Sequence, residues 1–113
     1  MRQHLIVGNW KMNVGTRDSV ALARGVLLAL RGRKTLPEVV ICPPFVALSE
    51  VRKAVARSHV ALGAQDLFWE DQGAFTGEIS ARMLSELGVT HVIIGHSERR
   101  QHLAETDEMV NKK

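Results

Sequence analysis

The sequence predicts an α/β fold in which helices cover a parallel sheet, and three observations lead to this prediction. Four short apolar runs recur along the 113 residues, and each is followed, directly or after a loop, by apolar residues at helical spacing. The runs are continuous rather than alternating, which is typical of strands covered on both faces. Glycine, proline or polar residues punctuate the junctions. The predicted order is therefore βαβαβαβα, with right-handed crossovers between parallel strands.

The first unit begins with a predicted strand at residues 5–7, which Gly8 closes. A helix is predicted to follow, with Thr16 as its N-cap and apolar residues at helical spacing as far as about Arg31. Gly32 is a suitable residue to stop this helix.

The second unit has a predicted buried strand at residues 38–42. The proline pair that follows ends this strand, because proline cannot donate to a ladder. The next helix is predicted to bury one face that carries Leu48, Val51 and Val55.

The third and fourth units are separated by a long polar segment. Residues 60–64 form the third predicted strand, and residues 65–78 form a loop whose length is usually functional or interfacial in a compact domain. Ser80 is predicted to cap a short helix after this loop. The fourth strand is predicted at residues 91–94, and Thr106 is predicted to cap the last helix.

Composition and charge narrow the class of protein. The apolar content of 45% and the charged content of 24% indicate a globular domain. The net charge is +3, but the basic residues are scattered, which argues against a nucleic-acid partner. The single cysteine, Cys42, lies in an apolar run, so it is expected in the core and cannot form an intrachain disulfide.

No targeting or spanning segment is expected. No apolar stretch approaches the roughly 20 residues of a membrane span. The first residues lead directly into a strand rather than into a signal peptide. We therefore expect a cytoplasmic protein without a membrane partner.

Chemically versatile side chains follow two of the predicted strands. Asn9 and Lys11 come after the first strand, and His96 and Glu98 come after the fourth, where Gly95 allows a sharp turn. The carboxyl ends of parallel strands are where such folds form sites. A lysine suits an anionic substrate, and a histidine can donate to a developing oxyanion, so the set suits proton transfer beside a carbonyl. Taken singly, each residue is more often a turn former, a solvated charge or a loop residue.

Six motifs stand in a fixed order along the chain. They are Asn9-Trp10-Lys11-Met12-Asn13, Cys42-Pro43-Pro44-Phe45, Gly63-Ala64-Gln65, Gly73-Ala74-Phe75-Thr76-Gly77-Glu78, Gly95-His96-Ser97-Glu98-Arg99-Arg100 and Glu105-Thr106-Asp107-Glu108. Together they closely resemble the N-terminal part of the triosephosphate isomerase family, over all 113 residues. Because several separate motifs match in order, the resemblance is highly specific.

The resemblance implies a (β/α)8 TIM barrel in which residues 1–113 form the N-terminal half, a single partial domain. It also implies an enzyme of glycolysis and gluconeogenesis. That enzyme interconverts dihydroxyacetone phosphate and D-glyceraldehyde 3-phosphate by proton transfer through an enediol(ate), with no cofactor and no metal ion. The half-barrel would be incomplete without a second segment or chain.

The resemblance also implies roles for individual residues. Lys11 would bind the triose phosphate and offset its negative charge, and Asn9 would hydrogen-bond near the substrate oxygens. His96 would be a neutral imidazole that polarises the carbonyl and moves a proton between the two oxygens, which is the established pattern for this enzyme. The N-terminus of the helix after Gly95 disfavours an imidazolium there. Glu98 would help to position Lys11 and the proton relay.

The loop from Gln65 to Glu78 looks like the dimer loop of the family. Its tip, Phe75-Thr76-Gly77, would insert beside the active site of another subunit, near Met12 and Asn13 of that subunit. An ordinary covering loop is the alternative. The aromatic residues near the tip favour an interface and hence an oligomer.

The chain departs from the family in length, since a barrel of this class takes roughly 250 residues. The family's glutamate base, closing lid and phosphate loops have no counterpart in these residues. Glu98 is not expected to act as the base in their absence. Three interpretations remain: a natural or engineered split enzyme with a complementary C-terminal chain, a half-barrel fragment, or part of a longer enzyme. The rival function is a non-catalytic, self-associating half-barrel scaffold.

Overall fold

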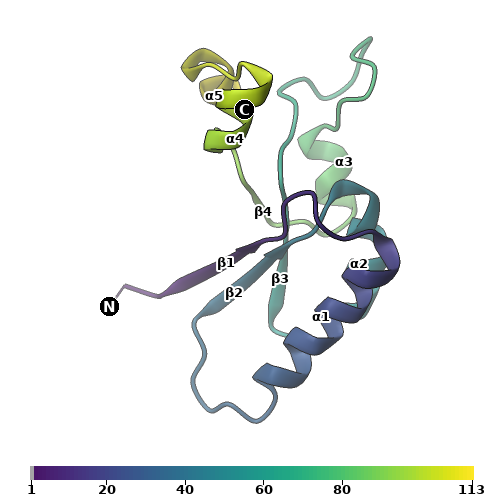
Figure 1. Ribbon diagram of the computed structural model, residues 1–113, viewed down its shortest axis with the longest axis vertical. Coiled ribbons are helices and arrows are strands. Elements are labelled where there is room, and N and C mark those ends of the chain that lie inside the picture. Colours follow the sequence, from purple (N-terminus) through teal and green to yellow (C-terminus); the bar gives the residue numbers. More distant parts are fainter. Residues whose placement is uncertain (1) are drawn as a thin grey trace.

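The computed structural model describes residues 2–113 and confirms the four-stranded parallel sheet (Figure 1). The strands lie in the order β1 (Leu5–Asn9), β2 (Glu38–Cys42), β3 (Val60–Ala64) and β4 (His91–Val92). The helices are α1 (Thr16–Leu30), α2 (Leu48–Val55), α3 (Ala81–Glu86), α4 (Ser97–Leu103) and α5 (Asp107–Lys112), and a 3-10 turn at Phe45–Ala47 precedes α2. Because each strand pairs with the next in the chain, the sheet follows the order of a curling barrel rather than of a doubly wound sheet.

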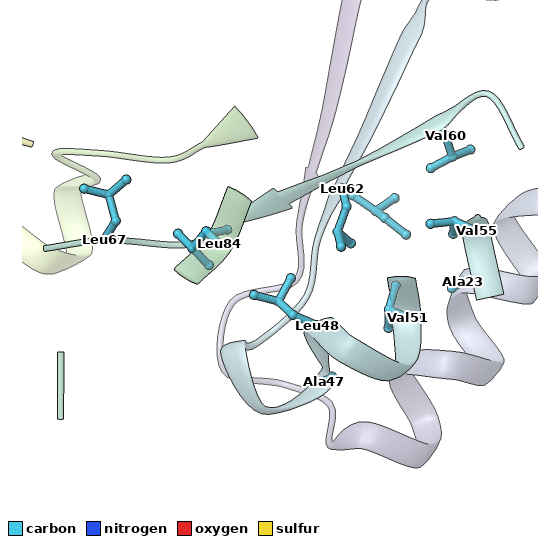
Figure 2. Close-up of a cluster of buried hydrophobic side chains, with 11 residues drawn as sticks. Ala23, Ala47, Leu48, Val51, Val55, Val60, Leu62, Leu67 and Leu84 are labelled. Atoms are coloured by element: carbon cyan, nitrogen blue, oxygen red, sulfur yellow. The ribbon is translucent and has the colours of Figure 1, made fainter. Parts of the chain in front are cut away.

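The core lies between the sheet and helices α1 and α2. Figure 2 shows Leu48, Val51 and Val55 of α2 facing β3, where Val60 and Leu62 lie, so the predicted apolar face of this helix is confirmed. Each such buried aliphatic side chain contributes roughly 1.5–3 kcal/mol. The cluster comprises Ala23, Ile41, Ala47, Leu48, Val51, Val55, Val60, Leu62, Ala64, Leu67 and Leu84.

Cys42 is a core residue, as predicted. It is 1% exposed, and burial raises the pKa of its thiol to about 11. The thiol is therefore protonated at neutral pH. Since the thiolate is the nucleophilic form, Cys42 is inert packing rather than a reactive group.

The two edge strands are less buried than continuous apolar runs predict. Leu5, Ile6 and Val7 of β1 are each between 44% and 55% exposed, because β2 alone flanks this strand among the described residues. The predicted strand at residues 91–94 is too long: β4 ends at Val92, and Ile94 is 40% exposed. The sheet therefore leaves open edges at β1 and β4 within residues 2–113.

Two of the three predicted N-caps are confirmed, those of α3 and α5, and the predicted N-cap of α1 is wrong. Ser80 and Thr106 each accept a hydrogen bond from the backbone N–H three residues on, at 3.1 Å and 3.2 Å, as predicted. The prediction for Thr16 is wrong, since Gly15 is the N-cap of α1. The Thr16 hydroxyl instead donates to the carbonyl of Val46, 3.3 Å away, and so ties α1 to the turn before α2.

The elements that carry the site lie together at the carboxyl ends of the strands. In Figure 1 the long loop between β3 and α3 rises at that end, on the same side as α4 and α5. Within this loop the Phe68 ring stacks on Trp69, with centroids 4.2 Å apart. None of the helices within residues 2–113 combines the length and the apolar character that crossing a membrane requires.

Candidate active site

A cavity of about 650 Å³ lies at the carboxyl ends of the strands. It collects residues from the end of β1, the β3–α3 loop and α4, and eight of the predicted site residues line it: Asn9, Lys11, Met12, Gln65, Gly77, Glu78, His96 and Glu98. Phe75 and Thr76 lie outside this lining. The Phe75 ring packs instead against Phe68 in its own loop, with centroids 4.6 Å apart.

The backbone of Lys11 is held in an unusual conformation at this cavity. Its φ of 55° lies in the left-handed region, which costs a residue with a Cβ about 1–2 kcal/mol. The Asn9 side-chain oxygen accepts the Lys11 N–H at 2.9 Å, and the Gln65 amide donates to the Lys11 carbonyl at 2.9 Å. Gln65 also donates to the carbonyl of Cys42 at 2.9 Å. These bonds anchor the strained turn to β2 and to the start of the long loop.

The Lys11 ammonium pairs with Glu98 across the cavity. Nζ lies 2.5 Å from Oε1, although the two residues are 87 positions apart in the chain. This hydrogen bond from Lys11 holds the pKa of Glu98 below its ordinary value. The Glu98 carboxyl group is therefore charged at neutral pH, and its ion pair with Lys11 fixes the position of the ammonium group.

The His96 ring caps helix α4. Nδ1 accepts the backbone N–H of Glu98 at 3.0 Å, whereas Oε2 of Glu98 lies 3.6 Å from Nδ1, beyond hydrogen-bond distance. A ring nitrogen that accepts carries no proton, so this bond selects the neutral tautomer with its hydrogen on Nε2. His96 is thus able to donate a hydrogen bond into the cavity that it lines.

Comparison with known proteins identifies the family to which the chain belongs. The sequence profile of the triosephosphate isomerase family matches residues 4–113 of the chain. The chain belongs to the triosephosphate isomerase family.

Individual members of the family are similar over the whole chain. The triosephosphate isomerase of Thermoanaerobacter pseudethanolicus is 53% identical over 113 residues, which is 100% of this chain and 45% of that protein. The triosephosphate isomerase of Alkaliphilus metalliredigens is 54% identical, with the same coverage of both chains. The crystal structure of triosephosphate isomerase from Bartonella henselae matches with a TM-score of 0.85 and 40% identity, over 99% of this chain and 46% of that one. The chain therefore spans less than half the length of the triosephosphate isomerases that it matches.

An ion network borders the cavity, and two of its members, Asp66 and Arg99, line it. Glu105, whose side chain is 0% exposed, accepts from Arg99 at 2.6 Å and lies 3.2 Å from the Lys113 ammonium. Asp66, at the start of the long loop, contacts the same two cations at 3.1 Å and 2.7 Å. Glu105 also accepts the N–H of Gly95 at 3.2 Å, where φ is 65°. The network joins the turn before His96 to the loop that begins with Gln65.

Burial alone acts to raise the pKa of Glu105. Hydrogen bonds from Arg99 and Lys113, together with the Gly95 N–H, more than offset that effect, so the pKa of Glu105 lies below its ordinary value. The carboxylate is charged although it is buried. This charge compensates the cations around it and helps to hold the turn at Gly95.

Sequence reasoning did not identify this network. A glutamate just before the N-cap of a helix is usually a solvated charge, and nothing local distinguishes Glu105 from Glu108. The only available signal is the family resemblance, in which Glu105 opens the last motif. Within residues 2–113, no group of three or more His, Cys, Asp or Glu side chains is placed to hold a metal ion.

Replacing Lys11 by methionine is expected to raise the pKa of Glu98 toward its ordinary value of 4.5, because the hydrogen bond from the ammonium is lost. A carbon-13 NMR titration of the Glu98 carboxyl group measures this change. Lys53→Met is the matched control, since Lys53 pairs with Glu50 at 2.9 Å on α2. That control leaves the pKa of Glu98 unchanged, and an unchanged value in Lys11→Met contradicts the assignment.

Proposed function

We propose that this chain supplies the Asn9, Lys11, His96 and Glu98 part of a triose-phosphate isomerase active site. The observation that best supports this proposal is that the ion-paired Lys11 and the neutral His96 tautomer line one cavity at the carboxyl ends of the strands. The reaction is the interconversion of dihydroxyacetone phosphate and D-glyceraldehyde 3-phosphate, in the cytoplasm, in glycolysis and gluconeogenesis. Family membership and 53% identity to a triosephosphate isomerase support this proposal.

The chemistry follows from the charge that develops during proton transfer. Removal of a proton from the carbon next to the carbonyl sends an electron pair to oxygen and gives an enediolate. The His96 Nε2–H donates to that oxygen and then transfers a proton between the two oxygens. Lys11 binds the anionic substrate and stabilises the negative charge, and Asn9 orients the Lys11 turn and hydrogen-bonds near the substrate oxygens. No cofactor enters these steps.

Glu98 acts as a positioning residue rather than as the base. Its pKa is lowered by Lys11, and a weaker base abstracts a carbon-bound proton less effectively. Its Oε1 is occupied by the lysine ammonium at 2.5 Å. The proposal therefore takes the general base, the lid and the phosphate loops from a further segment or a complementary chain.

Residues 1–113 are then the N-terminal half of one barrel domain. The exposed β1 edge, with Leu5, Ile6 and Val7, is where a strand of the other half pairs. The loop from Gln65 to Glu78 forms a subunit interface, in which Phe75, Thr76 and Gly77 insert beside the active site of another copy of the chain, near Met12 and Asn13 of that copy. Met12 is 95% exposed and Phe75 is 41% exposed, which supports an interface there.

A complementation assay tests the proposal. The chain is assayed for triose-phosphate isomerase activity alone and then in a titration with the remaining half of the Thermoanaerobacter pseudethanolicus enzyme. That half alone is the control. Activity that appears only in the mixture and saturates at a fixed ratio is the expected result. Robust activity of the chain alone contradicts the proposal, because that activity requires a general base within this chain.

The second candidate is a non-catalytic, self-associating half-barrel scaffold, and the exposed apolar residues of β1 favour it. It predicts a defined homo-oligomer by light scattering and no binding of triose phosphates or of an enediolate mimic. A mixture that assembles by light scattering but remains inactive favours this scaffold over the isomerase.

A further inference from the structure

A second cavity, of about 490 Å³, lies at the opposite end of the sheet from the candidate active site. It is bordered by the C-terminal end of α1, the loop at residues 31–37, and the segment at residues 57–60 that leads into β3. In Figure 1 this region is the lower end of the molecule, where α1 runs into the loop before β2. The two cavities share no lining residue.

The apolar part of the lining of this second cavity is aliphatic. It consists of Leu27, Leu30, Leu36, Pro37, Val39, Ala54 and Val60. The cavity volume falls within the range of roughly 300–1,000 Å³ that small-molecule sites occupy. No Phe or Trp ring lines it, so it lacks the flat surface on which nucleobases stack. A flexible hydrocarbon chain suits this lining better than a planar ring.

The polar part of the lining is basic. Arg31, Arg33 and Arg57 line the cavity with His59, and no Asp or Glu side chain does so. Within the part of the chain that the structure describes, none of these three arginines forms an ion pair with a carboxylate. A guanidinium group binds carboxylate or phosphate oxygens through two parallel N–H donors. An anionic head is therefore the complementary group at this surface.

We propose that this cavity binds an amphipathic anion, a medium-length aliphatic chain that ends in a carboxylate or phosphate. The chain lies along the leucine and valine side chains, and the head pairs with Arg33 and Arg57. This site is independent of the isomerase site and goes beyond the proposed function.

Calorimetric titration of the protein with decanoate, decyl phosphate, decanol and acetate tests the proposal. Either anionic amphiphile is expected to bind at least about tenfold more tightly than decanol, because one charge-assisted pair contributes that much. Acetate binds more weakly than decanoate for lack of a chain. The heat of binding is a readout that does not depend on isomerase activity.

Variants of the lining residues test whether the ligand binds in this cavity. The double variant Arg33→Gln/Arg57→Gln weakens decanoate binding about tenfold or more, since both cations are lost. Leu36→Asp, at a residue that is 39% exposed, places an anion in the lining and abolishes binding. Arg24→Gln is the matched control, because Arg24 is exposed on α1 and outside the lining, and it leaves affinity unchanged.

Three results overturn the proposal. One is the absence of binding by both anionic amphiphiles up to about 1 mM. Another is equal affinity for decanol and decanoate, which removes the role of the arginines. The third is decanoate binding that the double arginine variant and Leu36→Asp leave unaltered, which places the ligand elsewhere.

Discussion

In the proposed complemented isomerase, replacing His96 by asparagine is expected to lower kcat/KM by at least about a hundredfold, since loss of one preorganised donor at an oxyanion has this effect. Asparagine is chosen because it is a strong N-cap residue, so it preserves the cap of α4 that Nδ1 now provides. It has no group that donates and accepts a proton as imidazole does. The free energy of unfolding is therefore expected to stay nearly constant while turnover is lost.

The control for this prediction is His102→Asn. His102 lines the same cavity from α4 but makes no hydrogen bond among the described side chains, so turnover should change by no more than about threefold. Steady-state kinetics and urea denaturation on both variants separate chemistry from stability. Near-full turnover in His96→Asn would falsify the role of the ring.

Replacing Glu105 by glutamine lowers the free energy of unfolding by about 2–4 kcal/mol at pH 7, because Arg99 and Lys113 lose a charged partner in a buried site. Urea denaturation of the assembled protein measures this loss. Glu108→Gln is the matched control on the neighbouring helix. Glu108 pairs with Lys112 at 3.6 Å on the surface and is 79% exposed there, so its loss costs about 0.5 kcal/mol or less.

The same carboxyl group gives this stability a pH dependence. The pKa of Glu105 is lower in the folded state than its ordinary value of 4.5, so its stabilisation is present above that value. It is lost as the pH falls through the lower, folded-state pKa. The difference between the original chain and Glu105→Gln should therefore narrow below about pH 4.5. A difference that stays constant down to acid unfolding contradicts a charged Glu105.

The interior of the sheet could be predicted from sequence, and its edges could not. The strands at residues 38–42 and 60–64 match the prediction, because each is flanked by a strand on both sides and its apolar run is buried. The run at residues 91–94 looks equally apolar, yet only its first two residues are paired. A strand's length and burial depend on its neighbours, and an edge strand has one neighbour fewer.

The gathering of Asn9, Lys11, His96 and Glu98 was predictable, because parallel strands bring their carboxyl ends together. The family resemblance also made Glu98 a positioning partner of Lys11, but it did not predict the hydrogen bonds that hold the Lys11 backbone. Gln65 was predicted only as part of an interface loop, whereas its amide holds the Lys11 carbonyl at 2.9 Å. Such a contact joins segments 54 residues apart and depends on the curl of the sheet rather than on local sequence.

The hydrogen bond from the Glu98 backbone N–H to Nδ1 of His96 favours the tautomer with its hydrogen on Nε2, and this bond does not depend on any side-chain partner. A side-chain partner can be mutated away or neutralised by acid, but a peptide N–H does not titrate in any physiological range. Every residue type except proline at position 98 supplies the same donor. A change in the Glu98 side chain therefore leaves the hydrogen bond that orients the His96 ring in place, and the Glu98 carboxylate can pair with Lys11 at the same time.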